Sequence, residues 1–174
     1  LYLEPLLFKE WIHLAEISKK TGKNHSVVRQ YLNYFEKQGI LRKQIVGKMT
    51  MYIINMNYEL IVDIISIVEK EKLIKKAEDL ILKELVCQIH KTFANPVLIF
   101  GSFVENMKKA GDIDLLVVGE TDKKKFREIE DKLNKKMHLI NVDKLEDVSA
   151  ALKDEIRKKH LIIHGVEEIV KWLI

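Results

Sequence analysis

Apolar residues recur at helical spacing early in the chain, and two β-prone segments follow them. The spacing predicts a short helix that ends at Thr21-Gly22 and a second helix that begins near Asn24. The apolar stripe of this second helix consists of Val28, Tyr31, Leu32 and Phe35. The segments 41–46 and 50–54 meet around Gly47-Lys48, which predicts a β-hairpin.

The rest of the chain divides into a long helical stretch and a part that mixes strands with helices. Residues 58–93 contain neither Gly nor Pro and keep helical spacing, which predicts one or two helices with a break near Glu71-Lys72. The apolar runs 97–100 and 113–118 are typical of buried strands. We expect helices over 103–109 and 123–136 and a late strand over 161–165.

This pattern predicts three parts within an α+β or α/β fold class. Residues 1–57 form a helix-turn-helix followed by a hairpin, residues 58–95 form a helical connector, and residues 96–174 form a small domain with a mixed sheet. The apolar stripe of the connector suits the contact of a homodimer. Packing of the same stripe onto the C-terminal domain is an equal alternative.

Composition excludes several classes of protein. Of 174 residues, 47% are hydrophobic and 32% are charged, which is typical of a folded chain and not of a disordered polymer. The single cysteine excludes a disulfide framework or a zinc site made of several cysteines. No apolar run approaches the ~20 residues of a membrane span, and we find no signal peptide. We therefore expect a cytoplasmic protein without a membrane partner.

The formal charge of +4 is concentrated at one end of the chain. Residues 1–57 carry nine basic and four acidic side chains, a net charge of +5. The net charge is −1 for residues 58–95 and zero for residues 96–174. An excess of positive charge in the first part favours binding of a polyanion there. A solvated surface rich in lysine is the competing interpretation.

The run SVVRQYLNYFEKQGIL followed by a basic hairpin resembles the ArsR/MarR-type winged helix-turn-helix of prokaryotic regulators. The resemblance implies binding to double-stranded DNA, with one group of residues in the major groove and another on phosphates. The alternative is a domain that contacts a second copy or a partner and never touches nucleic acid. The groove-facing group is Ser26, Arg29, Gln30 and Asn33, and the phosphate group is Arg42, Lys43 and Lys48.

Two aspartates near the start of the second buried strand are candidate metal-binding and catalytic residues. Alternate residues of a strand share one face, so Asp112 and Asp114 lie together while Ile113 enters the core. Two carboxylates on one face repel each other unless a divalent cation neutralises them, and Mg²⁺ prefers such oxygen ligands together with phosphates. This favours a nucleoside triphosphate (NTP) as substrate or ligand, with Gly101-Ser102 offering backbone N–H groups and a hydroxyl to its phosphates.

The segment GSFVENMKKAGDIDLLVVGE is similar to the minimal signature of the DNA polymerase β nucleotidyltransferase superfamily. The resemblance implies a mixed-sheet fold over 96–165 and transfer of a nucleoside monophosphate from an NTP to a hydroxyl, with release of pyrophosphate. It further implies that Gly101 and Ser102 hold the phosphates and that Asp112 and Asp114 bind metal.

The family pattern also contains a third carboxylate, on a later strand, that this chain lacks. The strand expected over 137–142 places His138 in that position, and Asp143 follows only at the strand's end. His138 is therefore a candidate catalytic residue, although Mg²⁺ prefers oxygen ligands over imidazole. We expect loss of the carboxylate to reduce the transfer rate more than nucleotide affinity.

Three functions fit these features. The chain resembles predicted prokaryotic transcriptional regulators with a nucleotidyltransferase domain, which favours a DNA-binding regulator that carries a minimal transferase. In a variant of this hypothesis, the transferase fold is only a nucleotide sensor or a scaffold. The alternative is an active, antitoxin-like transferase that modifies a toxin-like partner protein or an RNA, and it rests on family analogy alone.

Overall fold

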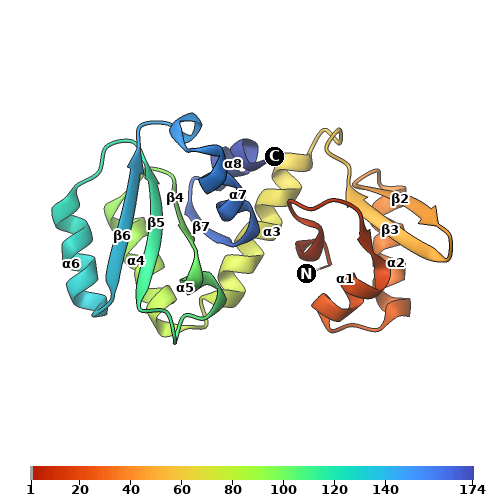
Figure 1. Ribbon diagram of the computed structural model, residues 1–174, viewed down its shortest axis with the longest axis horizontal. Helices are drawn as coiled ribbons and strands as arrows, with labels where there is room; N and C mark the ends of the chain where they lie inside the picture. The colour runs from red at the N-terminus through yellow and green to blue at the C-terminus, as the bar shows by residue number, and fades with distance from the viewer. Residues whose placement is uncertain (1) are drawn as a thin grey trace. The chain divides into compact units, whose positions relative to one another are not determined.

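The chain forms two compact units in a computed structural model that describes residues 2–174 (Figure 1). One unit extends up to Val68 and includes Ile174, and the other is Glu69–Leu173. The boundary between them falls inside helix α3 (Ile61–Lys76). No helix of residues 2–174 is long and apolar enough to cross a membrane.

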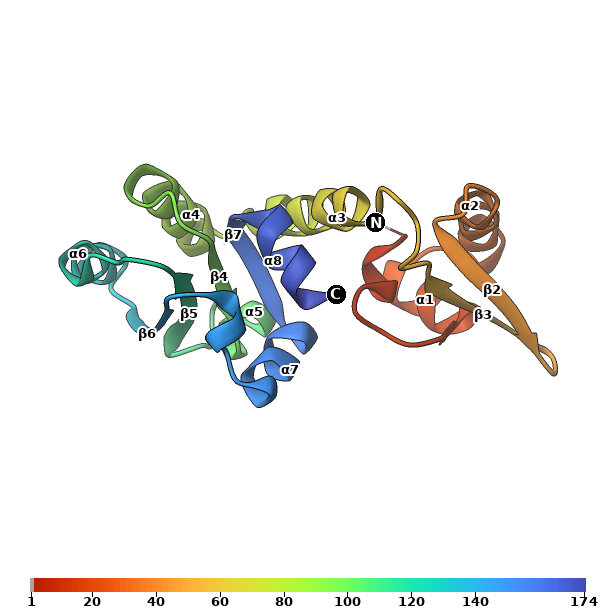
Figure 2. The same cartoon turned by 90° about the horizontal axis from the view of Figure 1, so that it is seen from above.

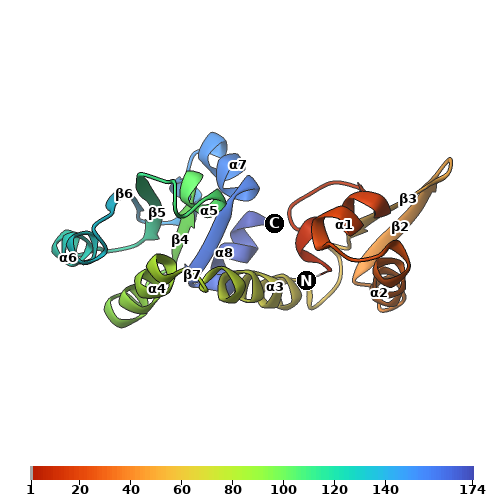
Figure 3. The same ribbon diagram turned by 90° about the horizontal axis from the view of Figure 1, so that it is seen from below.

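The first unit combines two helices with a small antiparallel sheet. The helices α1 and α2 contact each other and the β2–β3 hairpin (Figure 3). The strand order is β1-β3-β2, and both pairs are antiparallel. The elements are η1 (Glu4–Leu6), β1 (Ile12–His13), α1 (Leu14–Thr21), α2 (His25–Lys37), β2 (Leu41–Val46) and β3 (Met49–Ile54).

The apolar stripes of these helices form the core of the first unit, with one correction. Val28 and Leu32 of α2 are fully buried, as their spacing predicts, and Ile17 of α1 is fully buried as well. Tyr31 was expected in the same stripe but is 44% exposed, and its ring stacks on that of Tyr2 at a centroid distance of 4.3 Å. The stripe is therefore narrower than predicted, because Tyr31 lies at its edge, where the polar end of a tyrosine can stay in water.

The second unit contains a four-stranded mixed sheet in the order β6-β5-β4-β7. Strand β4 is antiparallel to both of its neighbours, whereas β5 and β6 are parallel. The strands are β4 (Val97–Phe100), β5 (Asp112–Val118), β6 (Lys136–Val142) and β7 (His160–His164). The predicted mixed α and β architecture is therefore confirmed for this part of the chain.

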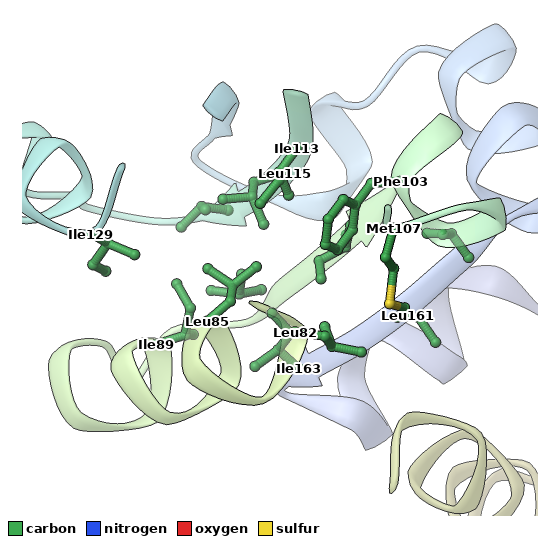
Figure 4. Packing of buried hydrophobic residues seen from close by; sticks show 14 of the residues in the cluster. Leu82, Leu85, Ile89, Phe103, Met107, Ile113, Leu115, Ile129, Leu161 and Ile163 are labelled. Atoms are coloured by element: carbon green, nitrogen blue, oxygen red, sulfur yellow. The ribbon is translucent and has the colours of Figure 1, made fainter. Parts of the chain in front are cut away.

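Helices cover the two faces of this sheet unequally. The larger core lies between one face and helices α4 and α6, where Leu85 and Ile89 of α4 pack against Ile113 and Leu115 of β5 (Figure 4). Helices α7 and α8 lie on the other side (Figure 2). The remaining elements are α4 (Leu80–Thr92), α5 (Ser102–Glu105), α6 (Lys123–Leu133), η2 (Leu145–Asp147), α7 (Ala150–Lys158) and α8 (Val166–Leu173).

Three predicted helix boundaries are wrong. The helix expected over 123–136 ends at Leu133, because Asn134 adopts the left-handed conformation that closes α6. Helix α3 has no break near Glu71-Lys72, because ion pairs within the helix, such as Lys75–Glu71 at 2.9 Å, link successive turns there. The chain instead breaks before Asp79, whose side chain caps α4. The helix expected over 103–109 is only α5, because the backbone leaves helical geometry at Asn106.

Candidate functional site

Strand β5 begins with the two aspartates, and their side chains share its solvent-facing side. Ile113 between them is fully buried, whereas the side chains of Asp112 and Asp114 are 38% and 27% exposed. Asp114 pairs with Phe100, the last residue of β4, in the antiparallel register. The carboxylates therefore stand beside the point where β4 ends.

Gly101 brings the backbone after β4 directly against one of these carboxylates. A Cβ atom at position 101 would lie 2.5 Å from Oδ2 of Asp114, closer than side-chain carbons approach oxygen. Its backbone angles of φ 76° and ψ −152° belong to a region open essentially to glycine alone. Both constraints select glycine here. Ser102 follows at the start of α5 and is exposed, so the predicted phosphate-binding residues lie next to the predicted metal ligands.

Helix α5, which carries Ser102, is held by two lysines from elsewhere in the same unit. The ammonium of Lys76 at the end of α3 donates a hydrogen bond to the carbonyl of Val104 at 2.9 Å. Lys159, just before β7, pairs with the carboxylate of Glu105 at 2.7 Å. These contacts position the short helix relative to α3 and β7.

His138 on β6 completes the cluster around the carboxylates. Its Nδ1 lies 3.3 Å from Oδ2 of Asp112 and 3.4 Å from Oδ1 of Asp114, because His138 and Asp114 are partners in the parallel register. Asp143 follows the opposite end of β6, five residues beyond the register partner of Asp114 and therefore about 16 Å away along the sheet. Asp143 is therefore too far from Asp114 to supply the missing carboxylate.

The face of the sheet around His138 is open, and it contains a residue that sequence reasoning did not assign to the site. The His138 side chain is 63% exposed, and Ile140 is 36% exposed. Lys136, two residues before His138, is the register partner of Asp112 and is also exposed. Lys136 could be found only once the parallel pairing of β5 and β6 was known.

The donor atoms fit a divalent cation at the two carboxylates. Hard cations such as Mg²⁺ take oxygen ligands, and often only one or two carboxylates plus water and phosphates. Within residues 2–174, no three His, Cys, Asp or Glu side chains are grouped so as to hold a metal ion. Asp112 and Asp114 would thus be the protein's ligands, with the remaining positions left for substrate and water.

A buried charged cluster joins α3 to β7, the strand next to β4, and sequence reasoning did not identify it. Glu69 of α3 is 1% exposed, and its carboxylate lies 2.8 Å from the ammonium of Lys72 and 3.4 Å from Nε2 of His160. His160 is the register partner of Phe100, the residue before Gly101. Burial raises the pKa of the Glu69 carboxyl, but His160 and Lys72 outweigh it and hold this pKa below its ordinary value.

The predicted DNA-binding residues all lie in the first unit. Most of them are exposed, on α2, on β2 or in the hairpin turn, and these are Ser26, Arg29, Gln30, Arg42, Lys43 and Lys48. The exception is Asn33, which was expected to face outward. Its Oδ1 accepts hydrogen bonds from Nζ of Lys43 at 3.1 Å and from the hydroxyl of Tyr52 at 3.2 Å. Asn33 therefore links α2 to the hairpin.

Comparison with known proteins gives similar solved structures. Among curated proteins there is no match. Two solved structures resemble the chain: a toxin-antitoxin with AMP-PNP, at 14% identity and a TM-score of 0.42, and a mutant of the toxin-antitoxin MntA-HpeT, at 13% identity and a TM-score of 0.40. Each alignment covers 52% of this chain and 79% of the other.

The sequence model of one family matches more than half of the chain. This family is described as the nucleotidyltransferase domain, and the match spans residues 80–171. It includes strands β4 to β7, and with them Gly101, Asp112, Asp114 and His138. The chain therefore belongs to the nucleotidyltransferase domain family.

Proposed function

We propose that the protein is an NTP-dependent nucleotidyltransferase whose acceptor is a partner macromolecule. The observation that carries the proposal is the packing of Gly101 against the Asp114 carboxylate, with Asp112 and Ser102 beside them, on an open face of the sheet. This arrangement puts phosphate-binding backbone and cation-binding oxygens within reach of one triphosphate.

Each residue has a distinct role in this proposal. Gly101 and Ser102 hold phosphate oxygens of the nucleotide, and Asp112 and Asp114 hold the cation. When bound, the cation neutralises phosphate charge in the transition state. An acceptor hydroxyl oxygen forms a bond to the α-phosphorus, the bond from that phosphorus to the bridging oxygen of the β-phosphate breaks, and pyrophosphate leaves. The hydroxyl proton passes to solvent or to His138, whose side chain is largely exposed beside both aspartates.

The surface of the first unit supports a protein as the acceptor. Tyr31 and Tyr34 of α2 are 44% and 57% exposed, and at the hairpin tip Ile45, Val46 and Met49 are all exposed. Tyrosine and methionine are enriched at protein interfaces, whereas phosphate backbones are bound mainly through basic side chains. An RNA is the alternative acceptor in this proposal. The labelling experiment below distinguishes an RNA acceptor from a protein acceptor.

Transfer of label from an α-³²P-labelled NTP tests the proposal. We expect label to enter a macromolecule of a cell extract in the presence of Mg²⁺, and protease or ribonuclease treatment to identify it as protein or RNA. Asp112→Asn combined with Asp114→Asn should abolish transfer, while Asp131→Asn on the exposed face of α6 should leave it unchanged. Transfer that persists in the double variant would contradict the site.

The second candidate is a DNA-binding regulator. We propose a winged helix-turn-helix in the first unit, supported by the order α1, α2, β2, β3 and by the exposed Arg29, Arg42 and Lys48. The net charge of +5 over residues 1–57 also favours this proposal. It predicts salt-dependent binding to duplex DNA that Arg29→Ala weakens.

A homodimer is a further proposal for the full chain. Ile67 and Ile74 of α3 are 65% and 72% exposed and lie seven residues apart on one face of the helix. Apolar residues at this spacing are typical of helix pairs between subunits. Sedimentation equilibrium of the full chain and of Ile67→Glu measures whether this stripe is the contact.

A further inference from the structure

Strand β6 presents no carboxylate to the open face of the nucleotidyltransferase unit. Because side chains alternate along a strand, Lys136, His138 and Ile140 share the face that Asp112 and Asp114 occupy on β5. The parallel register sets Lys136 beside Asp112 and His138 beside Asp114. The site therefore has an acidic strand next to a strand that carries a lysine and a histidine.

The acidic side chains at this site suffice for one divalent cation. Two carboxylates carry two negative charges, and the third group near them is the imidazole of His138, which is a poor ligand for Mg²⁺. Other nearby carboxylates are engaged or distant. Glu105 pairs with Lys159 at 2.7 Å, and Asp143 follows the far end of β6. A second cation would lack protein oxygens.

A bound triphosphate nevertheless needs more positive charge than one cation supplies, because it carries up to four negative charges. Lys136 is exposed, lies on the site face and makes no ion pair with another residue of 2–174. A lysine ammonium is an effective point charge for phosphate oxygens. Its long side chain can reach a phosphate bound between Gly101 and Asp112.

We propose that this site holds one divalent cation per nucleotide and that Lys136 binds the nucleotide's phosphates directly, in place of a second cation. The inference rests on the proposed function, since it assigns the phosphate and cation ligands of the same site. Lys136 is a binding residue in this assignment. His138 occupies the position at which a carboxylate could bind a second cation, so that the second cation lacks a ligand.

Equilibrium dialysis against Mn²⁺ and a labelled, non-hydrolysable NTP analogue tests this assignment. The ratio of retained Mn²⁺ to retained nucleotide should be one for the wild-type chain and should rise toward two for His138→Asp, which restores a carboxylate. Lys136→Ala should keep the ratio of one and weaken nucleotide binding roughly tenfold, the effect of one charge-assisted contact. Lys124→Ala, an exposed lysine of α6, is the matched control and should bind as the wild type does.

The outcomes separate this inference from the proposed function. Two Mn²⁺ per nucleotide in the wild-type chain would overturn the single-cation assignment. A ratio that stays at one in His138→Asp would overturn the role given to His138. Equal nucleotide affinities of Lys136→Ala and Lys124→Ala would overturn the role of Lys136. If the wild-type chain retained no nucleotide at all, the proposed transferase function would itself fail.

Discussion

At the scale of single residues, Gly101 sets the geometry of the candidate site. Its backbone conformation is one that other residues adopt only with strain, and its missing side chain leaves the space that the Asp114 carboxylate fills. Gly111, in the loop just before β5, has neither property. No atom lies within 4 Å of a Cβ built at this position, and its φ is not in the left-handed region. The two glycines therefore form a matched pair for mutation.

We expect Gly101→Ala to destabilise the fold by about 1–3 kcal/mol and to weaken nucleotide binding, because the new methyl group displaces the Asp114 carboxylate. Thermal unfolding and calorimetric titration with Mg²⁺ and a non-hydrolysable NTP measure the two effects. Gly111→Ala should leave both close to wild type. Wild-type nucleotide affinity in Gly101→Ala would show that the close approach to Asp114 is not needed.

At the scale of elements, the buried Glu69 joins helix α3 to strand β7. Its carboxylate contacts Lys72 on the same helix and His160 on β7, and all three side chains are largely removed from water. Removal of one partner from such a buried group is costly, since the remaining charges lose their compensation. His160 is also the register partner of Phe100 on β4, so the contact anchors the strand that pairs with the end of β4, from which Gly101 follows.

Glu69→Gln should reduce the free energy of unfolding by roughly 3 kcal/mol at neutral pH. The folded-state pKa of Glu69 is depressed below its ordinary value of 4.5, so the stabilisation is present above pH 4.5 and is lost as the pH falls through the folded-state pKa. The difference between variant and wild type in urea unfolding should therefore shrink in acid.

The control for this prediction is Glu167→Gln on α8. Glu167 also forms an ion pair, with Lys70 at 2.7 Å, but both side chains are more than half exposed, so we expect a loss below 1 kcal/mol. Equal losses in the two variants would contradict the special role of the buried cluster.

At the scale of the whole molecule, the two proposed activities use different residues in different units. The excess positive charge lies in residues 1–57, whereas the nucleotidyltransferase family match begins at residue 80. Arg29 lies on α2 of the first unit, and the aspartates lie on β5 of the second. The activities can therefore be separated by mutation.

We expect Arg29→Ala with Lys48→Ala to lower affinity for duplex DNA and to flatten its salt dependence, because fewer counterions are released on binding. Nucleotide affinity should not change. Asp112→Asn with Asp114→Asn should lower nucleotide affinity and leave DNA affinity unchanged. Electrophoretic mobility shift at several salt concentrations, beside calorimetry, checks both variants. If the first variant retarded DNA as the wild type does, with no dependence on salt, the proposal of a DNA-binding regulator would fail. The first unit would then be a protein-binding module.

The sequence alone determined the features that follow from local spacing. The buried strands 97–100 and 113–118, the shared face of Asp112 and Asp114 and the exposure of the basic residues all follow from short-range alternation or helical periodicity. Helix ends were less predictable. The α3 helix passes through the expected break at Glu71-Lys72, since its ends depend on side-chain pairs and caps as well as on apolar spacing.

Only the tertiary structure decided which distant residues meet. The family resemblance had already indicated His138, but only the parallel register of β5 and β6 brought its Nδ1 close to both aspartates. The same register placed Lys136 beside Asp112 and excluded Asp143. The burial of Glu69 against His160 joins positions 91 residues apart in the chain. Strand pairing and packing depend on the energy of the whole core and not on any local run of residues, so spacing along the chain does not encode them.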